Sequence, residues 1–73
     1  MTNSFDKYIT DEQKKAILEQ RINQLAAEGY QHNINLQIAT NSGNEALIEE
    51  SSNAIAIISN AIEVHENELE GLA

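Results

Sequence analysis

The chain has 73 residues, of which 12 are Asp or Glu and only 4 are Lys or Arg, so its formal net charge is -8. This length fits one small domain at most, and the absence of cysteine excludes disulfides and thiolate metal sites as supports for its core. The charge argues against binding to nucleic-acid phosphates or anionic membranes, and no apolar run approaches the roughly 20 residues of a membrane span.

Residues 1–9 are predicted to form an N-terminal arm. Phe5, Tyr8 and Ile9 are spaced so that one helical turn would place them on the same side. Two interpretations remain open at this stage. The segment is either a frayed tail whose aromatic rings fold back on the rest of the chain, or an arm that docks on a neighbouring molecule through Phe5 and Tyr8.

The first helix is predicted to span 10–41. Thr10 is a suitable N-cap, Gln13 completes the spacing of a capping box, and acidic residues follow at the positive end of the helix dipole. Apolar residues then recur in alternating steps of four and three, which is typical of a heptad seam that packs against another helix. The main seam residues are Leu18, Ile22, Leu25 and Leu36, with Gly29, His32 and Ala39 at the intervening positions. Gly29 either ends this helix or permits the close approach of another backbone.

The segment 30–38 has two possible structures. Apolar, aromatic and His residues alternate in it with Asn and Gln, which favours a strand. A single strand would have no partner, however, and the heptad continues through the same residues, so we prefer a helix. In a helix, Tyr30, Ile34 and Ile38 form a stripe on the side away from the seam, and this stripe is a candidate interface.

Residues 41–44 are the strongest break in the pattern. Gly43 suits a left-handed C-cap, and Asn44 suits the N-cap of the next helix. A connection this short predicts that the two helices are antiparallel neighbours.

The second helix is predicted to span 44–72 and also follows a heptad. Its apolar seam residues are Ile48, Ile55, Ile58, Ile62 and Leu69, followed by Leu72. Ser51 and His65 occupy the two other seam positions. Ile57 and Val64 lie farther round the helix, so its apolar arc is wider than one helical partner covers. We therefore include Ile57 and Val64 among the candidate interface residues.

Charged residues are distributed unevenly along the chain. All four basic residues lie within the first 21, and the second helix has seven acidic residues and no basic one. An antiparallel hairpin is predicted to place Lys14, Lys15 and Arg21 beside the acidic segment 63–70. The turn end is predicted to form an acidic tip, which a basic partner could contact or water could solvate. Its residues are Glu28, Glu45, Glu49 and Glu50.

His32 and His65 are the strongest candidates for a metal-binding or reactive site. Neither has the Glu three residues earlier that a di-iron bundle motif requires, so we expect no metal site and instead a seam histidine hydrogen-bonded to a polar partner. No nucleophile and base pair, phosphate-binding loop, dinucleotide signature or calcium loop is visible. We therefore expect no catalytic residues and no cofactor.

Taken together, these patterns predict an all-α protein: an antiparallel two-helix hairpin, coiled-coil-like, with the arm 1–9 and the hairpin 10–73. Two such rods enclose little core, so we expect a bundle completed by oligomerisation or by a partner protein. The expected function is a non-enzymatic interaction module, a small assembly or accessory subunit of a type that includes phage-encoded proteins. The alternative is an acidic inhibitor that binds a basic site on a partner protein as a nucleic-acid mimic. We expect a soluble protein of the cytoplasm, or of a phage particle if the chain is viral.

Overall fold

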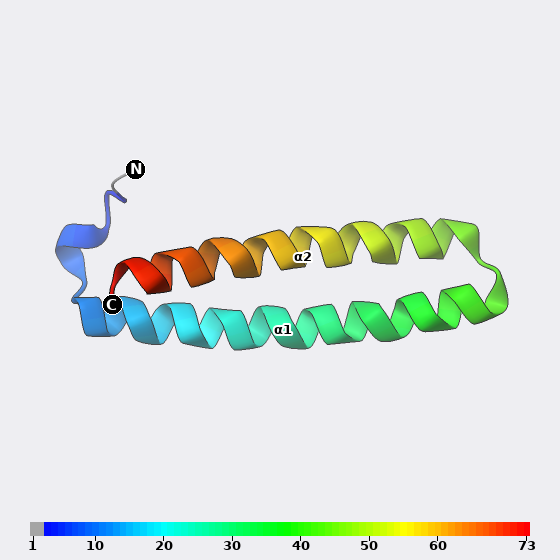
Figure 1. Ribbon diagram of the computed structural model, residues 1–73, viewed down its shortest axis with the longest axis horizontal. Coiled ribbons are helices and arrows are strands. Elements are labelled where there is room, and N and C mark those ends of the chain that lie inside the picture. The colour runs from blue at the N-terminus through cyan, green and yellow to red at the C-terminus, as the bar shows by residue number, and fades with distance from the viewer. Residues whose placement is uncertain (1–2) are drawn as a thin grey trace.

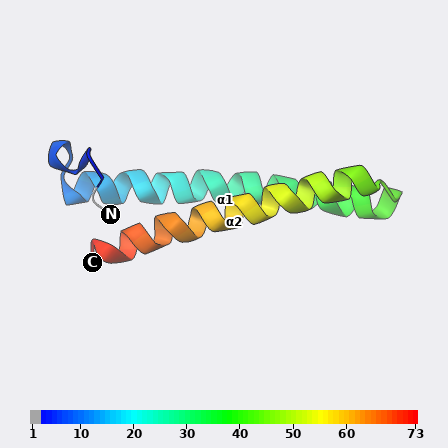
Figure 2. The same ribbon diagram turned by 90° about the horizontal axis from the view of Figure 1, so that it is seen from above.

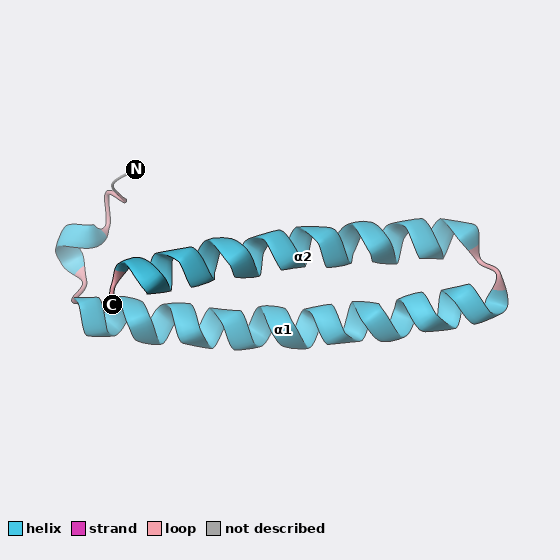
Figure 3. Ribbon diagram, viewed as in Figure 1, coloured by secondary structure: helices cyan, strands magenta, loops and turns pink. Residues whose placement is uncertain are grey.

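A computed structural model describes residues 3–73 and is helical almost throughout. A short 3₁₀ turn, η1 (Asp6–Tyr8), precedes two long helices, α1 (Asp11–Ser42) and α2 (Glu45–Gly71). The helices run antiparallel and pack against each other along their length, so both chain ends lie at one end of the rod and the turn lies at the other (Figure 1). No strand occurs in residues 3–73 (Figure 3). The predicted helical hairpin is thus confirmed.

Local side-chain chemistry sets the helix ends, as predicted. The Thr10 hydroxyl accepts a hydrogen bond from the Gln13 backbone N–H (3.1 Å), and the Gln13 side chain accepts one from the Thr10 backbone N–H (2.8 Å). Gly43 ends α1 with φ 67°, a left-handed conformation that suits glycine. Asn44 then caps α2 by accepting a hydrogen bond from the Leu47 N–H at 3.1 Å. These interactions satisfy backbone groups that a helix terminus otherwise leaves unpaired.

The ambiguous segment 30–38 is helical and lies in the middle of α1. Its alternating pattern does not produce a strand because the described chain offers no second strand to pair with. Gly29 does not end the helix. A Cβ built on Gly29 would lie 3.4 Å from Ile58 Cγ2, so the absent side chain allows α1 to approach α2 closely.

The hairpin encloses a thin core. Of residues 3–73, only Leu25, Ala39 and Ser51 are buried, with 4%, 0% and 2% of their surface exposed. The remaining seam positions between Leu18 and Leu72 are half-buried in both helices. Two of the three buried residues have small side chains, and both lie toward the turn. Packing between only two helices leaves most seam side chains partly in contact with water.

The molecule is far from compact for its mass. Its extents are 50 × 20 × 18 Å and its radius of gyration is 15.9 Å, whereas a compact domain of this length has a radius of about 11 Å. The helices lie along each other near the turn and diverge toward the chain ends when seen from above (Figure 2). The exposed surface is 5708 Å², roughly 1200 Å² more than a compact folded protein of 8.1 kDa has.

Candidate interaction surface

Among the described residues, seven large hydrophobic side chains are more than half exposed. They are Phe5 (67%), Tyr8 (71%), Ile17 (54%), Tyr30 (71%), Ile38 (57%), Ile57 (70%) and Val64 (52%). Scattered exposed apolar residues are normal on a protein surface, so their arrangement matters more than their number. No helix in residues 3–73 is both long enough and apolar enough to cross a bilayer.

The heptad places four of these side chains on one face of the hairpin. Successive helical residues are about 100° apart, so a residue that immediately precedes a seam position lies to one side of the seam. Antiparallel helices that face each other are related by a two-fold axis, which brings equivalent heptad positions of both helices to the same side. Ile17, Ile38, Ile57 and Val64 immediately precede Leu18, Ala39, Ile58 and His65, respectively. Three half-buried residues also precede seam positions and so lie on the same side of the hairpin: Leu47, Ala54 and Ala61. We call these seven residues the aliphatic face.

A hollow at the open end of the hairpin supports this assignment. Ile17 on α1 and Val64 on α2 line it together with the seam residues Leu18 and Leu72, and Ile9 of the arm contributes a further apolar side chain. Glu68, which precedes the seam residue Leu69, and Lys14, one heptad before Arg21, line the same hollow. The arm therefore borders this hollow and leaves Ile17 54% exposed.

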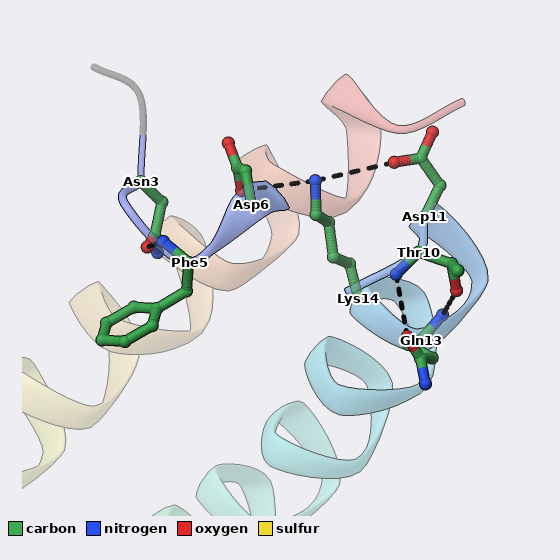
Figure 4. Close-up of polar contacts among 7 residues, drawn as sticks. All are labelled: Asn3, Phe5, Asp6, Thr10, Asp11, Gln13 and Lys14. Carbon is green, nitrogen blue, oxygen red and sulfur yellow. Dashed lines mark hydrogen bonds and ion pairs between the residues drawn. The ribbon is translucent and has the colours of Figure 1, made fainter. Parts of the chain in front are cut away.

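Ion pairs hold the arm in this position. Lys14 Nζ lies 3.3 Å from the Asp6 carboxylate in the arm and 3.6 Å from that of Asp11 at the start of α1 (Figure 4). Phe5 points away from these pairs (Figure 4), and Lys7 Nζ lies 5.1 Å from the centre of the Tyr8 ring. Both aromatic rings remain mostly exposed, so they do not fold back on the helices within one chain.

The opposite face of the hairpin is strongly acidic. Its residues immediately follow seam positions, as Glu19 follows Leu18 and Glu66 follows His65, or lie whole heptads before such residues, as Glu12 and Glu45 do. All its acidic residues are exposed: Glu12, Glu19, Glu45, Glu49, Glu63, Glu66 and Glu70. Lys15 is the basic residue at its margin and lines a second hollow with Glu66 and Glu70. We call this side the acidic face. The aliphatic side, by contrast, carries Lys14 and Arg21 against Glu28, Glu50 and Glu68.

Of the basic residues predicted to lie beside the segment 63–70, Lys14 lines a hollow with Glu68 and Lys15 lines one with Glu66 and Glu70, but within residues 3–73 none forms an ion pair with that segment. All ion pairs within residues 3–73 stay in the arm and α1: Lys14 with Asp6 and Asp11, and Arg21 with Glu28 at 4.0 Å. Lys14 has acidic neighbours closer than any in α2, because the arm turns back beside it. Lys15 shares a hollow with Glu66 and Glu70 without forming an ion pair. Charge pairing therefore orders the arm and does not link the two helices.

In two other sets of candidate residues, the members do not lie together in the structure. Of the back stripe, Tyr30 and Ile34 lie outside the aliphatic face, and only Ile38 belongs to it. Of the acidic tip, Glu45, Glu49 and Glu50 lie in the first two turns of α2. Glu28 lies near the middle of α1 beside Arg21, away from the turn.

The two histidines show no sign of a shared site. His65 is half-buried, and its Nδ1 lies 2.6 Å from the Ala61 carbonyl oxygen. This geometry requires Nδ1 to carry a proton and donate it to that carbonyl. His32 is half-buried on the other helix. Within the described part of the chain, no group of three or more His, Cys, Asp or Glu side chains could hold a metal ion.

Comparison with protein families, with characterised proteins and with solved structures finds no match to this chain. The aliphatic face is therefore defined by its own geometry. Ile17 was absent from the sequence-based candidates, although it lies three heptads before Ile38. Completing the heptad around Ile38 would have revealed it.

Proposed function

We propose that the chain is a non-enzymatic interaction module, a small helical subunit of a larger protein assembly whose aliphatic face is covered by another protein surface. The observation that carries this proposal is the set of four aliphatic side chains, each more than half exposed, on one face of the hairpin. An excess surface of roughly 1200 Å² is comparable to the area of about 800 Å² that each partner buries in a stable interface.

The energetics favour this coverage. Burying a large aliphatic side chain completely is worth about 1.5–3 kcal/mol. Because the four side chains are 52–70% exposed, covering each contributes about 1–2 kcal/mol. Within the described part of the chain, the single-chain core has only two buried hydrophobic residues, Leu25 and Ala39. A partner surface would therefore add substantially to the stability of so thin a hairpin.

The mass of the native complex tests the proposal. We expect the unmodified protein to occur in a species heavier than its own 8.1 kDa. Ile57→Glu should release a folded single chain. Ile57 is 70% exposed in the single chain, so a charge there leaves the hairpin folded and weakens only its contact with a partner. Tyr30→Glu is the matched control: Tyr30 is 71% exposed but lies outside that face, and its variant should remain in the complex. Equal masses for the two variants would contradict the proposal.

The acidic face favours a second candidate function, an inhibitor that occupies a basic site on a partner protein. The seven exposed carboxylates of this face gather at the two ends of a 50 Å rod, five near the open end and two near the turn, and each group could contact basic side chains of a partner. Such binding should weaken steeply as salt is added, because ion pairs between exposed groups are screened. Binding that persists in high salt and is lost in Ile57→Glu would exclude this candidate in favour of the first.

A further inference from the structure

We infer that the partner that covers the aliphatic face is a second copy of this chain, docked with its turn beside the open end of the first copy, so that two hairpins form an antiparallel four-helix bundle. This inference rests on the proposed function and identifies its partner. It follows from the spacing of the four exposed aliphatic residues, from the surface area and from the charge distribution.

The contact between Gly29 and Ile58 sets the register of the two helices. Twelve residues before Gly29, Ile17 lies level with Glu70 of α2. Nine residues after Gly29, Ile38 lies level with Glu49. From the turn to the open end, the exposed side chains thus follow in the order Ile38, Ile57, Val64, Ile17, at steps of about 12, 10 and 9 Å.

This order is close to symmetric about its centre. The midpoint between Ile38 and Ile17 falls between levels 59 and 60 of α2, and the midpoint between Ile57 and Val64 falls between 60 and 61. The two midpoints differ by about 1.5 Å, the rise of one residue. A two-fold axis across the rod at this level stacks each helix antiparallel on its own copy. Ile17 then packs on Ile38 of the second copy, and Ile57 packs on Val64 of the second copy.

The centre of the face carries Ala61 on α2 and Glu28 on α1, and Arg21 lies 4.0 Å from Glu28 and offsets its charge beside the axis. Ala61 lies at the symmetry level on α2, and its small side chain allows the two α2 helices to approach closely. A parallel arrangement lacks this match, because it places Ile57 against Gln31 and Val64 against Gln24 of the second copy. The spacing therefore selects the antiparallel arrangement.

The area of the face fits a second hairpin. A flat footprint of 50 × 18 Å covers roughly 900 Å², and a stable interface needs about 800 Å² from each partner. Only a partner of similar length covers all four aliphatic residues at once. A second copy of the chain has the same length and width as the first.

Electrostatics also favour this face for contact between identical chains. Each copy carries a net charge of -8, so two copies repel over most orientations. The acidic face carries seven exposed carboxylates with Lys15 at its margin, whereas Lys14 and Arg21 offset two of the three carboxylates on the aliphatic side. Identical chains thus meet least repulsion through their aliphatic faces.

Cross-linking tests the orientation directly, because the natural chain has no cysteine. Ile17→Cys protein is mixed with isotope-labelled Ile38→Cys protein and treated with a short bis-maleimide, and mass spectrometry separates mixed from like pairs. We expect the mixed 17–38 product in excess of both like products. Tyr30→Cys, outside the face, is the control and should give little product. Adding Ile57→Glu to both partners should abolish the 17–38 product.

Other outcomes overturn the inference in distinguishable ways. An excess of 17–17 and 38–38 products indicates a parallel dimer. A purified chain that remains single and does not cross-link excludes a second copy. In that case, a native complex that Ile57→Glu disrupts and Tyr30→Glu preserves would retain the interaction function with a different partner, and a complex that neither variant disrupts would remove both proposals.

Discussion

Gly43 ends α1 in a backbone conformation that side-chain-bearing residues rarely adopt. Its φ is 67°, and no other described residue has a positive φ. A Cβ built there meets nothing within 4 Å, so any cost of substitution comes from the backbone conformation and not from a clash. Gly29 differs: its backbone is ordinary helix, and a Cβ built there would lie 3.4 Å from Ile58 Cγ2, which leaves room for a methyl group but not for a larger side chain.

Gly43→Ala should therefore destabilise the protein by about 1 kcal/mol, the cost of a left-handed conformation for a residue with a Cβ. Gly43→Asn is the matched control and should cost less, because asparagine tolerates this conformation. Urea unfolding at one protein concentration measures both. Equal losses for the two variants would show that φ is not the cause.

Gly29→Ala should stabilise the protein by about 0.5–1 kcal/mol, because alanine is the better helix former and a Cβ at 3.4 Å from Ile58 is an ordinary contact. Gly29→Leu should instead destabilise it by about 1–3 kcal/mol, because the larger side chain would overpack the interface between the helices. The same unfolding measurement compares the two. A stable Gly29→Leu protein would mean that the helices do not approach closely at this point.

At the scale of the elements, local chemistry determines where each helix begins and ends. Thr10 and Gln13 exchange two hydrogen bonds at the start of α1, and Asn44 caps α2. The arm is held by a different kind of interaction, the ion pair between Asp6 and Lys14. Exposed pairs of this kind contribute little stability, so the arm is placed but weakly held.

Thr10→Ala should cost about 1 kcal/mol by removing the side-chain acceptor of the capping box. Thr40→Ala is a suitable control, since the Thr40 hydroxyl donates to the Leu36 carbonyl within the same helix and caps no terminus. Thermal unfolding of the two variants at equal concentration should show the loss only for Thr10→Ala. A matching loss in both would indicate a general effect of removing threonine from α1.

The sequence predicts these elements well, because caps and heptads depend on residues close together in the chain. It predicts side-chain partners less well. Lys14 was expected to face α2, but the arm brings Asp6 to it, and the arm's path depends on a 3₁₀ turn that its sequence does not specify. Ile17 was missed because the equivalent positions in the next two heptads, Gln24 and Gln31, are polar. The aliphatic face becomes visible only when both helices are placed side by side.

At the scale of the whole molecule, two long helices form a rod with two unlike sides. One side carries seven carboxylates, and the other carries four exposed aliphatic residues. This asymmetry favours an orientation within an assembly, with the aliphatic face inside and the acidic face in water. It also explains how a chain with so thin a core could gain stability from a neighbour.

The most direct test of this account is sedimentation equilibrium of the purified, unmodified chain at low and high salt. We expect a species of twice 8.1 kDa that dissociates on dilution. Its association should be tighter at high salt, because salt screens the repulsion between two chains of charge -8. A mass of 8.1 kDa at every protein and salt concentration would contradict it.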